Sequence, residues 1–122
     1  MRRRIYVDTS VFVGCEERGF RVSSGRLIDS FVLGENTAIV SAMTIVELLV
    51  APNSIRERLL SVPRAHLKTP AVTEEIESLA TEYINRGVIG AKHRADAIHI
   101  ATASVERADV LVSWNFKHIV NL

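Results

Sequence analysis

Three acidic residues occupy positions that core packing alone does not explain. Asp8 directly follows the apolar run Arg4–Val7, Glu47 lies among large apolar residues, and Asp96 stands at the start of another apolar stretch. Carboxylates that lie close together repel one another unless a divalent cation lies between them. All-oxygen ligation suits Mg²⁺ or Mn²⁺, and such an ion activates water for attack on a phosphodiester. The first hypothesis is therefore a Mg²⁺ or Mn²⁺ site formed by these three acids.

Each acid taken alone also has an ordinary structural interpretation. Asp8 can form an Asx turn or a helix cap with Thr9 and Ser10. Glu47 can lie on a narrow solvated stripe of a mostly buried helix, and Asp96 can be the N-cap of its helix. The metal hypothesis depends on convergence, because a strand end, a helix after a second strand and a helix start can all reach one rim.

The elements that would position these acids follow from the apolar periodicity. Short apolar runs predict strands at 4–7, 37–40, 65–68 and 109–113. Helices are expected at 41–50, 54–60, 73–86 and 95–107, and a further one begins at Ser23 or Ser24 and is closed by Gly34. Ser54 and Glu57 have the spacing of a capping box at the second of these helices. Strands that lack polar alternation and are separated by helices predict an α/β fold with a central parallel sheet covered on both faces. Ligands of such sheets bind beyond the carboxyl ends of the strands.

Length and composition limit the class of protein. The 122 residues are expected to form one domain, and 48% hydrophobic residues are enough to fill its core. A net charge of +1 gives no general attraction to nucleic acid or membrane, so binding to a polyanion must come from local clusters of Arg and Lys. The single cysteine, Cys15, excludes an internal disulfide and a cysteine-based zinc site, and it is expected to be a small core residue. The longest apolar run is too short to span a bilayer, and we expect a cytoplasmic protein.

Four segments resemble the motif blocks of PIN-domain proteins, in the order of that family. They are YVDTSVF at 6–12, IVEL at 45–48, DAIHIATA at 96–103 and LVSWNFKHI at 111–119. The chain is most similar to the VapC-type toxins of toxin–antitoxin pairs. This resemblance implies a PIN-like three-layer α/β/α sandwich over residues 1–122 and metal-dependent endoribonuclease activity. It places Asp8, Glu47 and Asp96 on the metal-binding acids of the family, and Ser10 on a small polar position that supports the site.

The sequence departs from the family pattern at the fourth position of the site. The resemblance assigns this catalytic position to Asn115, where the family usually has Asp. The change removes one negative charge, although an amide oxygen can still contact a metal ion or its water. We expect a weaker second-metal position, so that one or two metals remain possible. An alternative is a catalytically weak or inactive PIN-like module that binds RNA or a partner.

The resemblance also implies an RNA substrate, a cognate antitoxin protein and a homodimer. Several basic residues lie in segments that flank the acids and can form an RNA path, namely Arg2, Arg3, Arg4, Arg18, Arg21, Lys92, Arg94 and Lys117. Trp114 either stacks on a base or is an anchor in the core or at the rim of the site, and His99 is expected to be a packed or half-exposed imidazole.

Two other enzyme classes fit the sequence less well. An aspartyl-phosphate mechanism at Asp8 would want a second Asp two residues later, where this chain has Ser10. A nucleotide-binding Rossmann domain would need a glycine-rich turn after the first strand, which is missing here.

Overall fold

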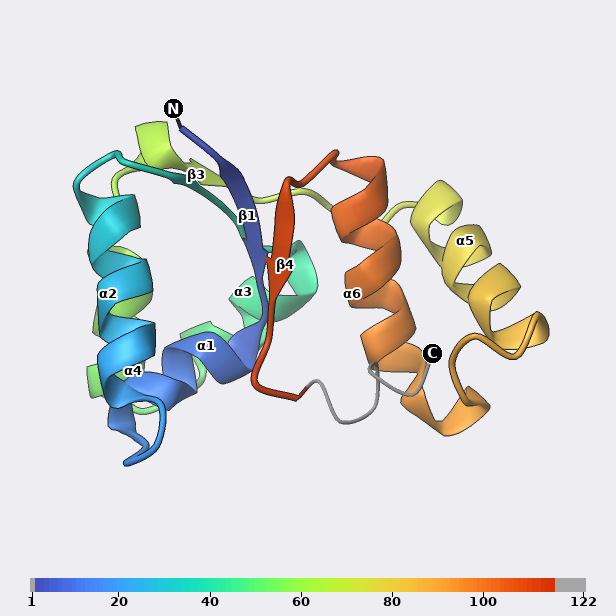
Figure 1. Cartoon of the computed structure of the whole chain (residues 1–122), viewed down its shortest axis with the longest axis horizontal. Coiled ribbons are helices and arrows are strands. Elements are labelled where there is room, and N and C mark those ends of the chain that lie inside the picture. The colour runs from blue at the N-terminus through green and yellow to red at the C-terminus, as the bar shows by residue number, and fades with distance from the viewer. Residues whose placement is uncertain (1, 116–122) are drawn as a thin grey trace.

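Four parallel strands form the central sheet of the computed structural model, which describes residues 2–115 (Figure 1). The strands lie in the order β3-β2-β1-β4 and comprise β1 (Arg4–Val7), β2 (Thr37–Ile39), β3 (Leu67–Lys68) and β4 (Val110–Val112). In the centre, Ile5 of β1 lies opposite Ala38 on one side and opposite Val110 on the other. The predicted parallel sheet is confirmed, although β3 is shorter than expected because residues 64–66 form a 3-10 turn.

Helices cover both faces of this sheet, which makes the predicted three layers. The helices are α1 (Thr9–Val13), α2 (Arg21–Val32), α3 (Ala42–Leu49), α4 (Asn53–Leu60), α5 (Glu74–Asn85) and α6 (Arg94–Val105). Alternate side chains of β1 divide the core, since Ile5 and Val7 pack with residues of α1, α2 and α4. Tyr6 points to the other face, where it packs with Ala103 of α6. Figure 1 accordingly shows α2 and α4 on one side of the sheet and α6, backed by α5, on the other.

Several helix ends follow the expected capping rules. The hydroxyls of Ser41 and Thr73 accept backbone N–H bonds at the starts of α3 and α5. Gly34 and Gly87 follow the ends of α2 and α5 with φ of 76° and 73°, a conformation that favours glycine. Gly34 leads from α2 into β2, whereas Gly87 leads from α5 toward α6.

Two predicted helix starts are wrong. Helix α2 begins at Arg21 without a side-chain cap, and Ser24 is instead buried inside it, where its hydroxyl binds a distant side chain. Ser54 lies within α4, which begins directly after Pro52, so no capping box forms there. In both cases a proline or a tertiary contact decides the start, and the polar side chain next to it does not.

The short helix α1 was not expected from periodicity, since five residues are too few to display it. It begins directly after Asp8 and, with the 3-10 turn Gly14–Glu16, leads the chain away from the carboxyl end of β1. Across residues 2–115, no helix combines the length and the hydropathy needed to cross a bilayer.

Candidate active site

Asp8 lies at the carboxyl end of β1 and is almost completely buried, with 4% of its surface exposed. Its Oδ1 accepts hydrogen bonds from the backbone N–H of Ser10 at 3.0 Å and from the Ser10 hydroxyl at 2.5 Å. Its Oδ2 accepts a hydrogen bond from the Ser113 hydroxyl at 2.5 Å. Asp8 is thus the N-cap of α1, as its structural interpretation predicted. All the donors in these three contacts are uncharged, and they stabilise the negative charge of the carboxylate.

The end of β4 lies beside Asp8 because β4 pairs with β1, with Val112 opposite Val7. Ser113 is buried, with 3% of its surface exposed, and its hydroxyl also accepts a hydrogen bond from the backbone N–H of Asn115 at 3.0 Å. The structure therefore brings Asn115, about 107 positions away in the sequence, to the same end of the sheet as Asp8.

Glu47 lies in the last turn of α3 and contacts the first residue of α1. Its Oε2 accepts a hydrogen bond from the Thr9 hydroxyl at 3.0 Å. Glu47 is exposed, and so are its neighbours Val46 and Val50, at 65% and 84%. The expectation of a mostly buried helix is therefore wrong, because α3 buries only Thr44 and Leu48.

Asp96 is the third residue of α6 and is half-buried. The N-cap interpretation is wrong, since α6 begins at Arg94 and His93 precedes it. The carboxylate Oδ2 lies 3.9 Å from Nδ1 of His93. Its negative charge in the first turn is favourable because it interacts with the positive end of the helix dipole.

A buried pair, Tyr6 and His99, lies within electrostatic reach of all three acids. The Tyr6 hydroxyl is 2.6 Å from Nδ1 of His99, which confirms the packed imidazole. Burial lowers the pKa of His99, while the charges of Asp8, Glu47 and Asp96 each oppose that shift. Burial raises the pKa of Tyr6 to about 12, with smaller contributions in the same direction from Asp8 and Glu47. His99 is therefore a buried imidazole that is influenced by carboxylates from three separate segments of the chain.

The donor set of this region fits a hard divalent cation. All three acids offer oxygen ligands, and no lysine or arginine within residues 2–115 forms an ion pair with any of them. In that same part of the chain, no three His, Cys, Asp or Glu side chains are arranged as a metal site. Direct ligation by all three acids therefore stays a prediction, and Mg²⁺ commonly keeps several waters between itself and the protein.

Two residues of this region were missed in the sequence. Thr9 holds Glu47, and Ser113 joins Asp8 to the chain around Asn115. The signal for Ser113 was available, since it follows the last strand as Asp8 follows the first. What the sequence does not reveal is that these two strands are neighbours.

The basic residues expected to flank the acids do not all lie there. Arg2, Arg3 and Arg4 lie at the amino end of β1, so the length of that strand separates them from Asp8 (Figure 1). Arg18, Arg21, Lys92 and Arg94 lie in segments near the starts of α2 and α6, whereas Lys117 and the last residues of the fourth motif lie outside the described residues.

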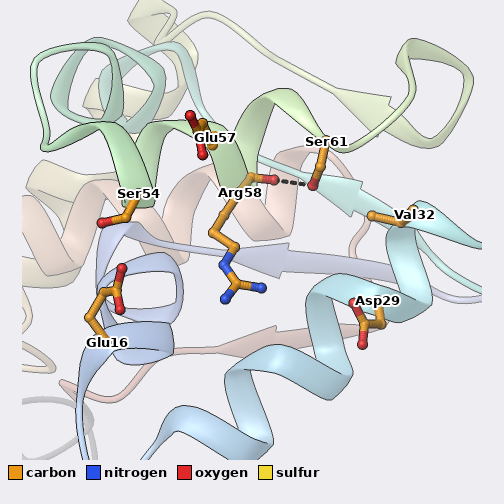
Figure 2. A pocket seen from close by; sticks show the side chains of 7 residues that line it. All are labelled: Glu16, Asp29, Val32, Ser54, Glu57, Arg58 and Ser61. Carbon is orange, nitrogen blue, oxygen red and sulfur yellow. Dashed lines mark hydrogen bonds between the residues drawn. The ribbon is translucent and has the colours of Figure 1, made fainter.

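A separate cavity of about 420 Å³ lies between α2 and α4 (Figure 2). It is lined by Glu16, Asp29, Val32, Ser54, Glu57, Arg58 and Ser61, and the Arg58 side chain extends toward the space between Glu16 and Asp29. None of these residues is a predicted site residue, so Asp8, Glu47 and Asp96 do not line this cavity.

Comparison with known proteins gives one family match. The family model for the PIN domain matches residues 5–116. No protein of curated function gives a significant match to the sequence.

Solved structures similar to this chain match it over nearly its whole length. VapC20 of Mycobacterium tuberculosis, a sarcin–ricin loop cleaving toxin, is 17% identical with a TM-score of 0.65, covering 96% of this chain and 94% of its own. A toxin–antitoxin complex from Klebsiella pneumoniae is 16% identical with a TM-score of 0.71, covering 97% and 92%. VapBC2 from Rickettsia felis, bound to a DNA fragment from its promoter, is 18% identical with a TM-score of 0.59, covering 98% and 95%. At these identities the likeness concerns the fold.

Proposed function

The chain belongs to the PIN domain family, and on this premise we propose that it is a Mg²⁺- or Mn²⁺-dependent endoribonuclease and the toxin of a toxin–antitoxin pair. One observation carries the proposal. Asp8 is 4% exposed and its carboxylate accepts hydrogen bonds from two hydroxyls and a backbone N–H, while no lysine or arginine of residues 2–115 forms an ion pair with Asp8, Glu47 or Asp96. A buried carboxylate without a cationic partner is costly, and a divalent cation removes that cost.

In this proposal Asp8 and Asp96 hold the cation, and Glu47 contacts it directly or through water. When bound, the cation would supply an activated water and stabilise the negative charge that develops on the phosphate. Asn115 offers an amide oxygen toward the cation or an N–H toward a phosphate oxygen. It is a weaker ligand than the usual Asp, because it contributes a dipole in place of a charge.

The neighbouring residues orient these groups before substrate binds. Ser10 and Ser113 fix both oxygens of Asp8, and Thr9 holds Glu47 through its hydroxyl. Since these contacts exist without substrate, the acids need little reorganisation when RNA arrives. No side-chain nucleophile is required.

A protein partner is the second part of the proposal. Four large apolar side chains are exposed by 48% to 84%. They are Val46 and Leu49 of α3, Val50 directly after α3, and Leu60 of α4. Two of them, Leu49 and Leu60, line a largely apolar hollow of about 500 Å³ between α3, α4 and β3. Exposed apolar patches of this kind mark interaction surfaces. Because similar structures include a toxin–antitoxin complex, we propose a cognate antitoxin as partner, together with a homodimer.

Light scattering and co-purification with the protein encoded beside it would test that part. A strict monomer at tens of micromolar with no co-purifying partner would contradict it. The cytoplasmic location and the assignment of residues 1–122 to a single domain stay predictions.

Activity is tested with the purified protein freed of any partner. We expect it to cut RNA in the presence of Mg²⁺ or Mn²⁺ and to stop when EDTA is added. Asp8→Ala, Glu47→Ala and Asp96→Ala should each abolish cutting while circular dichroism reports an intact fold. Glu82→Ala is the control, since Glu82 is an exposed acid of α5 that pairs only with Arg86 among the ion pairs described.

Two outcomes would contradict this assignment. Cutting that persists in the Asp96→Ala protein would move the chemistry to other residues. Binding of RNA without any cleavage by the wild type would favour the alternative, a PIN-like binding module.

A further inference from the structure

An aromatic pair lies beside Asp8 and the end of β4. The rings of Phe20 and Trp114 are stacked, with centroids 5.0 Å apart and an angle of 16° between their planes. Phe20 is the residue before α2 and is 36% exposed, whereas Trp114 is half-buried. Trp114 directly precedes Asn115, so the pair lies beside the end of β4.

The indole of this pair is held firmly in place. Its Nε1 donates a hydrogen bond to the hydroxyl of Ser24 at 2.9 Å, and its backbone N–H donates to Ser10 Oγ at 2.9 Å. Gly14 allows the indole to approach closely, since a Cβ at this position would lie 2.6 Å from Nε1. The Ser10 hydroxyl also donates a hydrogen bond to Asp8, so this one hydroxyl connects Trp114 with Asp8.

We propose that the outward face of Phe20 stacks on an unpaired base of the RNA substrate, next to the phosphodiester that is cut. This inference rests on the proposed function and adds a residue that would contact a base beside the cut. A fixed aromatic ring with an exposed face gives base stacking without loss of side-chain freedom. A base inside a duplex is covered by its neighbours and cannot reach the ring.

The charges around Phe20 favour a base over a phosphate as the group that is bound. The segment from 16 to 21 contains Glu16, Glu17, Arg18 and Arg21, all exposed, and their formal charges cancel. This segment therefore has no net attraction for the RNA backbone, and the exposed ring is its main binding feature. Stacking tolerates any base, so Phe20 selects for single strands and not for sequence.

The test measures binding by fluorescence anisotropy of a labelled RNA oligomer, with EDTA present to prevent cleavage. The variant Phe20→Leu keeps an apolar side chain but removes the aromatic face. We expect it to bind single-stranded RNA roughly 5- to 150-fold more weakly than the wild type, the range expected for loss of one stacked base. Phe20→Tyr should restore binding. Val22→Ala alters an exposed side chain (66%) of the adjoining helix α2 and should leave binding unchanged.

Three further measurements separate stacking from other effects. Wild type and Phe20→Leu should bind a duplex of the same sequence equally, and should also bind an abasic strand of the same length equally. The slope of log K against log salt should be the same for both proteins, because stacking releases no counterions. Trp114 is the only tryptophan, so its fluorescence during thermal unfolding verifies the fold, and Phe20→Met repeats the test if the leucine variant is unstable.

The possible failures are distinguishable. If the wild type cuts RNA and Phe20→Leu binds it as tightly as the wild type, the inference is overturned and the proposed function stands. An equal loss on single strands and duplexes also overturns it, because a paired base cannot stack on the ring. Weaker binding of the co-encoded protein with unchanged RNA affinity would assign the pair to that partner and overturn the inference. A wild type that neither binds nor cuts RNA overturns the inference together with the proposed function.

Discussion

Replacing Ser113 by alanine removes a hydrogen bond between the residue that follows β4 and Asp8. Its hydroxyl donates to Asp8 Oδ2 at 2.5 Å and accepts the N–H of Asn115 at 3.0 Å, and Ser113 is 3% exposed. A hydrogen bond to a charged group contributes about 1.5–3 kcal/mol, and water cannot easily replace it at a buried position. We therefore expect Ser113→Ala to lower the free energy of unfolding by about 2–3 kcal/mol.

Thermal unfolding measures this loss directly. Unfolding entropies of about 2.1 cal/mol/K per residue give about 0.26 kcal/mol/K for 122 residues, so the midpoint should fall by about 8–12 °C. The matched control is Ser61→Ala, since the Ser61 hydroxyl donates at 2.6 Å to a backbone oxygen on the exposed side of α4. That variant should change the free energy of unfolding by less than about 0.5 kcal/mol.

The reasoning also requires a specific effect on activity. Without its Ser113 donor, Asp8 is free to turn away from its position, so cleavage should fall even at temperatures where the variant is fully folded. If Ser113→Ala unfolds within about 1 °C of the wild type, like the Ser61→Ala control, the hydroxyl does not stabilise Asp8 and the argument from burial is refuted.

The remaining predictions concern charge at the site and its dependence on pH. Asn115→Asp should tighten Mn²⁺ binding and raise cleavage at low metal concentration, because it adds a charge. Asn115→Ala should reduce cleavage less than alanine at Asp8 or Asp96 does. Mn²⁺ titrations that are identical for the wild type and Asn115→Asp would place this residue outside the metal site. In the absence of metal, Asp8→Asn should lower the melting temperature, because an amide replaces the carboxylate that accepts hydrogen bonds from the Ser10 and Ser113 hydroxyls, and it should abolish the further rise on adding millimolar Mn²⁺; a raised melting temperature without metal would mean that repulsion between the acids outweighs these hydrogen bonds. Burial lowers the pKa of His99 below its usual 6.5, so just below pH 6.5 the unfolded chain binds a proton at His99 and the folded chain does not. The free energy of unfolding is therefore highest above pH 6.5 and decreases as the pH falls below 6.5. His99→Gln should flatten the dependence of stability on pH just below 6.5, and an unchanged pH profile from urea unfolding would contradict the neutral, buried imidazole.

The sequence predicted the positions of the strands well because each is a short apolar run with a sharp end. The strand that ends at Val7 is an example, and it placed Asp8 correctly at the carboxyl end of the sheet. The pairing of strands is a property of the whole chain and has no local signal. This is why Ser113, which directly follows the distant strand β4, was not predicted as the partner of Asp8.

Helix ends and burial were harder to predict because tertiary contacts override local preferences. Ser24 was expected near the start of α2 as a cap, yet its hydroxyl is occupied by the indole of Trp114. The apolar composition around Glu47 indicated a buried helix, but Val46 and Val50 face outward. Composition alone cannot distinguish side chains that are buried in the core from those that are exposed to a partner.

The pairing of β1 with β4 also determines when the site can form during folding. The two strands join the beginning of the chain to residues 110–112, and Asp8 and Ser113 are separated by 105 positions. Contacts between such distant segments form late, since the entropy of closing a long loop must be overcome first. On the ribosome, the contact between Asp8 and Ser113 cannot form until residue 113 has left the exit tunnel. A nascent chain that has not reached this point therefore lacks the hydroxyl that holds Asp8 in place, and its catalytic site would still be incomplete.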